Sequence, residues 1–145
     1  MPETRTLKRA RKDRRQGKSP STQAGEFVRE EIHHVREGKH GARSTRQAIA
    51  IGLSKARRAG VKLGTPKRAS ARTKQSARSA SKRAGKKPSA RRSRAAHRAL
   101  EREGRRAASS TALARQAKSS ARKRGRTDRQ RAARKAARTR RRRRA

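Results

Sequence analysis

The chain has 145 residues, of which 49 are Lys or Arg and nine are Asp or Glu, so its formal net charge is +40 and its pI is near 12.0. A large excess of one sign opposes compaction and indicates an anionic partner: nucleic acid, a membrane surface or an acidic protein. Membrane binding needs an apolar face rich in Trp, Phe or Leu, and binding of single strands by stacking needs aromatic side chains. One Phe, no Trp and no Tyr argue against both and leave recognition of the phosphate backbone by charge.

The same composition argues against several other classes of protein. The absence of Cys rules out disulfide scaffolds and Cys-ligated zinc and fits a reducing cytoplasm. No run approaches the roughly 20 apolar residues of a membrane span, and no apolar signal-peptide segment lies near the N-terminus, so we expect a cytoplasmic protein. No arrangement of residues supplies a nucleophile, an oriented base and an enclosed pocket. We therefore expect neither an enzyme nor a cofactor.

We expect three segments: a basic N-terminal arm (1–18), a small ordered module (19–63) and a long basic tail (64–145). A first helix is predicted over about 19–37, with Ser19 as N-cap and Gly38 as its stop. Its apolar stripe follows helical spacings of four, four and three. The stripe consists of Ala24, Val28, Ile32 and Val35, with Phe27 beside it.

A second helix is predicted over about 44–59. Ser44 and Gln47 form a capping box, and Gly60 ends the helix. Gly52 would permit close approach of a partner helix. Two helices joined by so short a loop most simply form an antiparallel hairpin.

The predicted hairpin has a thin core. A unit of about 45 residues is close to the size below which single domains struggle, so it should dimerise or fold on its ligand. The expected dimer or partner contacts are Phe27, Val28, Ile32 and Ile51.

The tail is a low-complexity sequence of Arg, Lys, Ala and Ser, with 32 Lys or Arg against three acidic residues. So much like charge should leave it disordered when alone, although its composition favours helix once phosphates remove the repulsion. The predicted fold is therefore mostly α: a small helical hairpin with a long disordered or conditionally helical tail.

The first predicted helix carries an acidic patch made of Glu26, Glu30, Glu31 and Glu37. Acidic side chains near DNA would be repelled, so this helix is expected to face away from nucleic acid. Its acids could pair with the second helix or with a partner's basic arm, and the intramolecular pairing is the preferred interpretation. The candidate bases of the second helix are Arg46, Lys55, Arg57 and Arg58.

His33, His34 and His40 lie near these acids and invite a metal site. On a helix only residues three or four apart share a face, so the set does not form a regular ligand pattern. A solvated polar face is the preferred interpretation, and no metal is predicted.

Residues 25–60, GEFVREEIHHVREGKHGARSTRQAIAIGLSKARRAG, resemble a family of small, very basic bacterial proteins described as of unknown function, as plasmid-stabilisation proteins or as DNA-binding. The resemblance extends over roughly residues 8–63. The tail is similar in composition to the tails of linker histones and their bacterial histone-like counterparts. The resemblance implies a bacterial DNA-binding protein.

These observations predict a histone-like, nucleoid-associated protein that binds DNA without sequence specificity, neutralises phosphates, and bridges and compacts duplexes. Three alternatives stay open: association with RNA or the ribosome, a plasmid-stabilisation adaptor whose hairpin binds a protein partner, and a helix-turn-helix in which Arg43, Arg46 and Gln47 read bases. The predicted phosphate contacts are Arg43, Arg46, Lys55, Arg57, Arg58, Lys62, Arg91, Arg92, Arg94, Arg105, Arg106, Arg122, Lys123, Arg124, Arg134, Lys135, Arg138, Arg140, Arg141, Arg142, Arg143 and Arg144.

Overall fold

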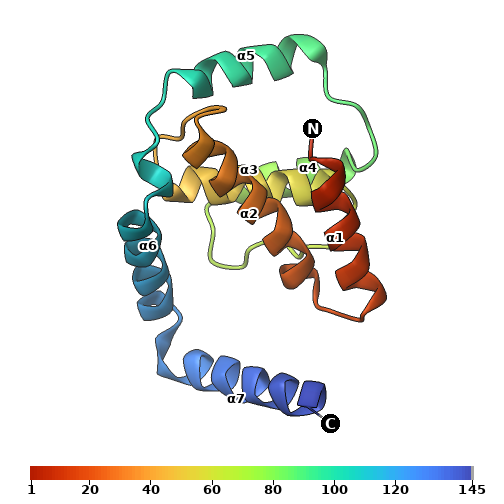
Figure 1. Ribbon diagram of the computed structural model, residues 1–145, viewed down its shortest axis with the longest axis vertical. Coiled ribbons are helices and arrows are strands. Elements are labelled where there is room, and N and C mark those ends of the chain that lie inside the picture. The colour runs from red at the N-terminus through yellow and green to blue at the C-terminus, as the bar shows by residue number, and fades with distance from the viewer. Residues whose placement is uncertain (145) are drawn as a thin grey trace. The chain divides into compact units, whose positions relative to one another are not determined.

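The computed structural model describes residues 1–144, with side chains as far as Arg142, and helices separated by loops follow one another from Thr4 to Arg144 (Figure 1). Its two compact units are Met1–Ser109 and Ser110–Ala145. The elements are α1 (Thr4–Arg15), α2 (Pro20–Glu37), α3 (Thr45–Arg58), α4 (Ala71–Lys82), α5 (Ala90–Glu101), the 3₁₀ turn η1 (Arg106–Ala108), α6 (Ser110–Lys123) and α7 (Gly125–Arg144). The prediction of a small hairpin with a long disordered or conditionally helical tail is wrong, because four of the helices lie beyond residue 64.

The helices expected over 19–37 and 44–59 are α2 and α3, and each begins and ends at its local signals. The hydroxyls of Ser19 and Ser44 accept hydrogen bonds from the backbone N–H three residues on, at 3.4 and 3.2 Å. Gly38 and Gly60 have φ of 77° and 88°, a left-handed conformation that lets the following N–H groups satisfy the last helical carbonyls. Capping chemistry thus determines both helices.

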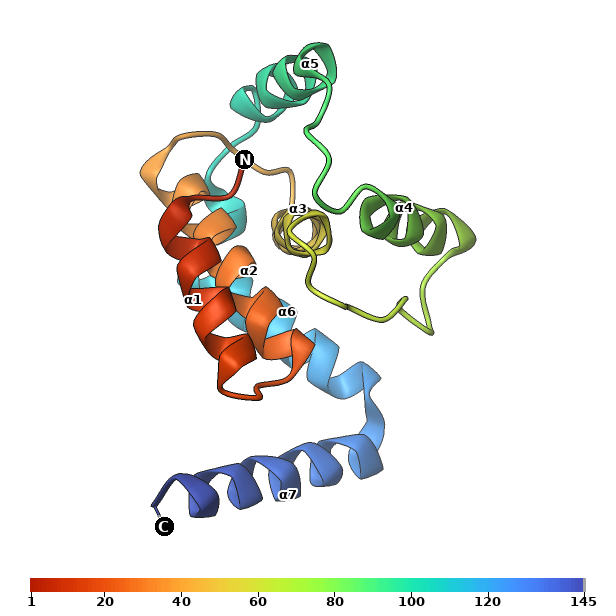
Figure 2. The ribbon, with the colours of Figure 1, turned by 90° about the vertical axis from the view of Figure 1, so that its right-hand side faces the viewer.

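The arrangement of these two helices differs from the antiparallel prediction, because α3 crosses α2 (Figures 1 and 2). They meet near their midpoints at Gly52, where an added Cβ would stand 2.7 Å from Val28 Cα and 3.0 Å from the Phe27 carbonyl oxygen. A closest approach at the midpoints of both helices favours a crossing over a lengthwise alignment. The helix that runs alongside α2 in the opposite direction is α1 (Figure 2).

The core of the first unit draws on the segment that was expected to be a basic arm. Phe27 is 1 % exposed and packs against Ala10 of α1, with Leu7 beside it. These contacts bury the apolar side of residues 4–15, which explains why they are helical. The other members of this core are Ala24, Leu53, Ala56, Val61 and Leu63.

The beginning of the predicted tail also folds onto the module. Helix α4 begins at an N-cap, Ser70, whose hydroxyl accepts from the Thr73 N–H at 3.3 Å. It packs against α3 and buries Ala77 and Ala80. Alanine in a low-complexity sequence does not look like core, but its small side chain allows two helices to approach closely.

Residues 100–108 dock on the loop between α2 and α3. The N–H of Gly41 donates to the Leu100 carbonyl at 2.9 Å, and the N–H of Ala42 donates to the Gly104 carbonyl at 3.0 Å. The turn η1 packs against α2 and α3 with Ala108 fully buried. Two side chains add to these backbone hydrogen bonds: the Thr45 hydroxyl donates to the Ala107 carbonyl, and the Arg36 guanidinium donates to the Ala108 carbonyl.

The second unit consists of α6 and α7, which contact each other. Helix α7 is 20 residues long, its only apolar residues are alanines, and every side chain described on it is exposed. No helix within residues 1–144 combines the length and the apolar character that crossing a membrane requires.

Candidate nucleic-acid interface

The acidic side chains are used inside the first unit. Seven of the nine acids lie within ion-pair distance of a Lys, Arg or His: Glu3, Asp13, Glu26, Glu30, Glu31, Glu37 and Glu101. Of the bases expected from the second helix, Lys55 lies 3.8 Å from Glu30 and 2.6 Å from Glu31. The nine acids of the chain can balance only a minor part of the charge of its 49 Lys and Arg residues.

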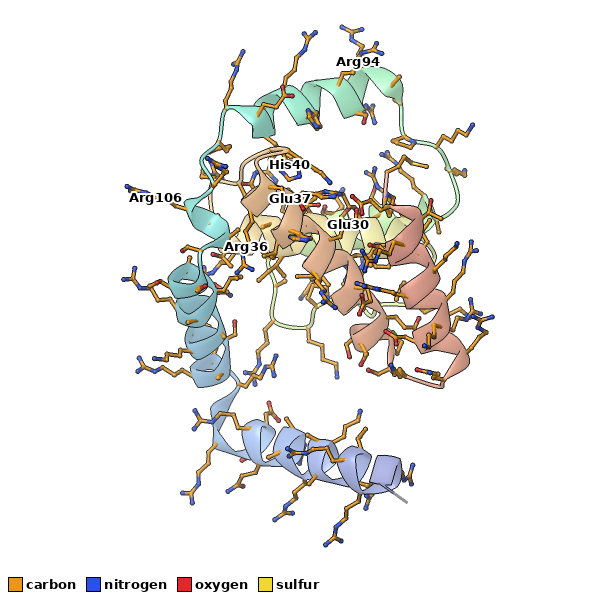
Figure 3. The ribbon with its side chains drawn as sticks, viewed as in Figure 1. Glu30, Arg36, Glu37, His40, Arg94 and Arg106 are labelled. Atoms are coloured by element: carbon orange, nitrogen blue, oxygen red, sulfur yellow. The ribbon has the colours of Figure 1, made fainter. Side chains whose placement is uncertain are left out.

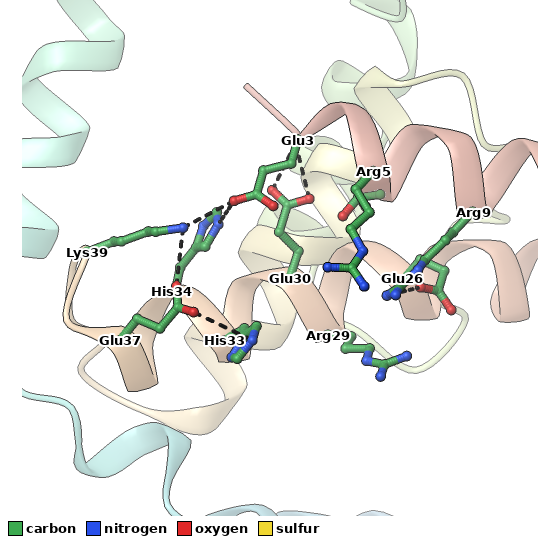
Figure 4. Close-up of a pocket in the computed structure, with 11 residues that line it drawn as sticks. Glu3, Arg5, Arg9, Glu26, Arg29, Glu30, His33, His34, Glu37 and Lys39 are labelled. Carbon is green, nitrogen blue, oxygen red and sulfur yellow. Dashed lines mark hydrogen bonds and ion pairs between the residues drawn. The ribbon is translucent and has the colours of Figure 1, made fainter.

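A shallow pocket of about 250 Å³ lies along the seam between α1 and α2 (Figure 4). Its lining alternates acids with bases, and the Glu3 carboxylate joins the two helices by accepting from His34 and Lys39 at 2.8 and 3.2 Å. The hydrogen bonds from His34 and then Lys39 lower the pKa of the Glu3 carboxyl from 4.5 to about 2. Small-molecule pockets are mostly apolar and enclosed, so this seam is a structural ion-pair network.

Two of the predicted phosphate contacts take part in the fold itself. The Lys55 ammonium is bound to Glu30 and Glu31, and its side chain is 22 % exposed. The Arg57 residue is only 9 % exposed, and its guanidinium donates to the Gly64 carbonyl at 3.1 Å. The structure therefore places both side chains in intramolecular contacts.

The remaining predicted contacts are exposed wherever their side chains are described. Figure 3 shows Arg94 and Arg106 extending away from the first unit. The side chains of Arg143 and Arg144 lie outside the described part of the structure. The exposed residues are Arg43, Arg46, Arg58, Lys62, Arg91, Arg92, Arg94, Arg105, Arg106, Arg122, Lys123, Arg124, Arg134, Lys135, Arg138, Arg140, Arg141 and Arg142.

Helix α5 presents a basic surface of its own. Within residues 1–144 it packs against no other helix, and it buries none of its residues. Arg91, Arg94 and Arg98 follow one another at spacings of three and four, so they share a face. Arg98 was not among the predicted contacts, although helical spacing would have indicated it.

Helix α7 carries its cations in two stripes. The denser one, called here the α7 stripe, comprises Arg131, Arg134, Lys135, Arg138 and Arg142, at helical positions i, i+3, i+4, i+7 and i+11. Arg126, Arg129 and Arg140 lie on the opposite side. The predicted contacts missed Arg126, Arg129 and Arg131, whose signal is again the helical period.

The helix-turn-helix alternative requires the N-terminal end of α3 to be free to enter a groove. That end is covered, because Thr45 is 8 % exposed and donates its hydroxyl proton to the Ala107 carbonyl at 2.6 Å. The Gln47 side chain is also engaged, since its carbonyl oxygen accepts from the Arg43 N–H at 2.7 Å. Arg43 and Arg46 beside them are exposed, so the helix-turn-helix alternative stays a prediction.

The residues expected to contact a partner are buried or half-buried in the first unit. Phe27 is a core residue, and Ile32 is 9 % exposed. Val28 is half-buried at the crossing with Gly52, and Ile51 is also half-buried. The thin core is completed by α1 and α4, so these side chains do not form an exposed apolar surface.

No protein-family model, curated protein or solved structure matches this chain. The resemblance to small basic bacterial proteins therefore stays a prediction.

Proposed function

We propose that the protein binds DNA without sequence specificity, as a histone-like, nucleoid-associated protein that neutralises phosphates through its exposed cationic helices. The observation that carries this proposal is α7: its described side chains are all exposed, it has no large apolar residue, and a single acid, Asp128, accompanies its cations. A helix of this kind offers nothing to a protein core and a continuous row of charge to a polyanion.

The spacing of the α7 stripe suits a duplex backbone. Residues 131–142 span about 16 Å along the helix axis, because an α-helix rises 1.5 Å per residue. A DNA duplex carries one phosphate charge per about 1.7 Å of its axis. Each of the five stripe cations can therefore meet a phosphate, whatever the base sequence.

Bridging is supported by the presence of cationic helices in both units. The first unit exposes Arg91, Arg94 and Arg98 on α5, and the second unit exposes the α7 stripe. A chain with two separate basic surfaces can contact two duplex segments, which would compact DNA.

The test is the salt dependence of binding by the full-length protein, measured by fluorescence anisotropy with two duplexes of unrelated sequence. If the α7 stripe alone neutralises five phosphates, log Kd rises with log salt concentration with a slope of at least about 4.5. The two sequences should bind with closely similar affinity. A Kd that does not change with salt would refute the proposal, and tighter binding of duplex RNA than of duplex DNA would assign the protein to RNA.

A further inference from the structure

Three of the chain's four histidines converge in the first unit. His34 on α2, His40 in the following loop and His97 on α5 lie edge to face in a row, with ring centroids 6.0 Å apart for the first pair and 6.2 Å for the second. The fourth, His33, is exposed and pairs with Glu37 on its own helix. The fold thus gathers imidazoles from three different segments.

Glu31 lies beside this row and its side chain is fully buried. Its Oε1 is 3.2 Å from His40 Nε2 and its Oε2 is 2.6 Å from Lys55 Nζ, yet neither oxygen makes a hydrogen bond of acceptable geometry. A buried carboxylate that lacks hydrogen bonds is costly unless a charge compensates for them. Lys55 supplies that charge at Oε2 of Glu31. The other oxygen, Oε1, faces His40.

The orientation of His40 directs its Nε2 toward Glu31. Its Nδ1 is 3.0 Å from the Gly41 carbonyl oxygen, which can only accept, so Nδ1 carries a proton. In the neutral ring Nε2 is then an acceptor, and it faces the carboxylate Oε1 at 3.2 Å. Two acceptors at this distance require a proton or a metal cation between them.

We propose that Glu31, His34 and His40 bind a divalent transition metal of the zinc type. One donor atom from each of the three lies within 4.8 Å of the other two. Around a tetrahedral zinc ion, ligand atoms stand about 3.3 Å apart, given metal–ligand distances of about 2.0 to 2.1 Å. Glu31 Oε1 and His40 Nε2 already have about this separation, at 3.2 Å. Rotation of the His34 side chain would bring its donor nitrogen to the same distance from the other two ligand atoms.

The surroundings of the three ligands match what a metal site needs. Metal-bound histidines and carboxylates usually have hydrogen-bonding or charged partners that orient them. Lys55 holds Oε2 of Glu31, the Gly41 carbonyl holds His40, and Glu3 Oε1 lies 2.8 Å from His34 Nε2. His97, whose ring lies beside that of His40 and whose Nδ1 is 2.9 Å from Glu101 Oε1, is the candidate for a fourth position.

A bound metal would tie α2, the loop at His40 and, through His97, α5 to one point. A chain of net charge +40 repels dications from its surface, so binding of one equivalent requires a preformed site.

The experiment titrates Co²⁺ and then Zn²⁺ into the untagged full-length protein. We expect Co²⁺ to give a ligand-field absorption that saturates at one equivalent and is displaced by Zn²⁺. His34→Gln and His40→Gln should weaken binding by more than about 100-fold, since even loss of an orienting partner costs 10- to 100-fold. His33→Gln, the neighbouring exposed histidine, is the matched control and should bind like the native chain.

Thermal unfolding provides a second measurement. Zn²⁺ at about 100 times its Kd should raise the Tm of the native chain and of His33→Gln by about 10 °C. Absence of both the absorption and the Tm shift in the native chain overturns the proposal, whether or not the variants fold. Equal weakening by His33→Gln and His40→Gln also overturns it, because the metal would then be bound elsewhere.

Discussion

Replacing three arginines of the α7 stripe by glutamine, Arg131→Gln, Arg134→Gln and Arg138→Gln, tests the proposed interface directly. Glutamine has nearly the helix propensity of arginine, so α7 is preserved while three cations are lost. Each phosphate contact contributes about 0.9 to the salt slope, so the slope of log Kd against log salt should fall by about 2.7. If these contacts contribute little at 1 M salt, the affinity at 0.1 M falls by about 500-fold.

The control removes the same charge from the opposite side of the helix, by Arg126→Gln, Arg129→Gln and Arg140→Gln. Anisotropy titrations of both triple variants against one duplex over a range of salt give the two slopes. We expect the control slope to change by less than about 1. Equal losses in both variants would refute the assignment of the α7 stripe as a face that contacts phosphates, because net charge alone would then account for binding.

Three further predictions concern the first unit. Gly52→Ala should lower the free energy of unfolding by about 2 kcal/mol, as measured by urea denaturation. The added Cβ would stand 2.7 Å from Val28 Cα and force α2 and α3 apart at a cost of about 3 kcal/mol. The higher helix propensity of alanine offsets about 1 kcal/mol of this cost. Gly41→Ala places a Cβ on the Glu103 carbonyl oxygen and should speed trypsin cleavage within 100–109 by releasing this segment. NMR titration of the Glu3 carboxyl should show a midpoint near pH 2 instead of 4.5.

Each of these predictions has its own control or contradicting result. Gly25→Ala, in α2 with nothing within 4 Å of the added Cβ, should stabilise by about 0.5 to 1 kcal/mol, and an equal loss in Gly25→Ala and Gly52→Ala would contradict the close crossing. Gly64→Ala, also in open space, should leave cleavage unchanged. Because the Glu3 pKa is lower in the folded chain, the stability from this carboxyl is complete above pH 4.5 and is lost as the pH falls through about 2. A midpoint near 4.5 would mean that the contacts with His34 and Lys39 do not form in solution.

The sequence by itself determined where α2 and α3 begin and end, because capping is local chemistry. Ser19, Ser44, Gly38 and Gly60 act on backbone groups within a few residues. The value of Gly52 as a point of close approach could also be read from the sequence. The arrangement could not, since a glycine shows that two backbones meet and does not show at what angle.

Only the tertiary structure decided what the arm and the tail do. Leu7 and Ala10 look like isolated residues in a basic segment, yet they complete the core around Phe27. Ala77, Ala80 and Ala108 read as low complexity, but small side chains pack where helices approach closely. In so basic a sequence the expected charge repulsion predicts disorder. The few small apolar residues whose packing opposes that repulsion are therefore easily overlooked.

The histidines and acids show the same division. From the sequence, His33, His34 and His40 with the neighbouring acids form no regular ligand pattern and predict a solvated polar face. In the fold, Glu31 is buried beside His40, and His97 arrives from a helix that begins 50 residues further along the chain. Composition determined the net charge, because charge adds up regardless of conformation, and the class of partner that it predicts is still to be tested. Which side chains meet depends on how distant segments pack, and only the folded chain decides that.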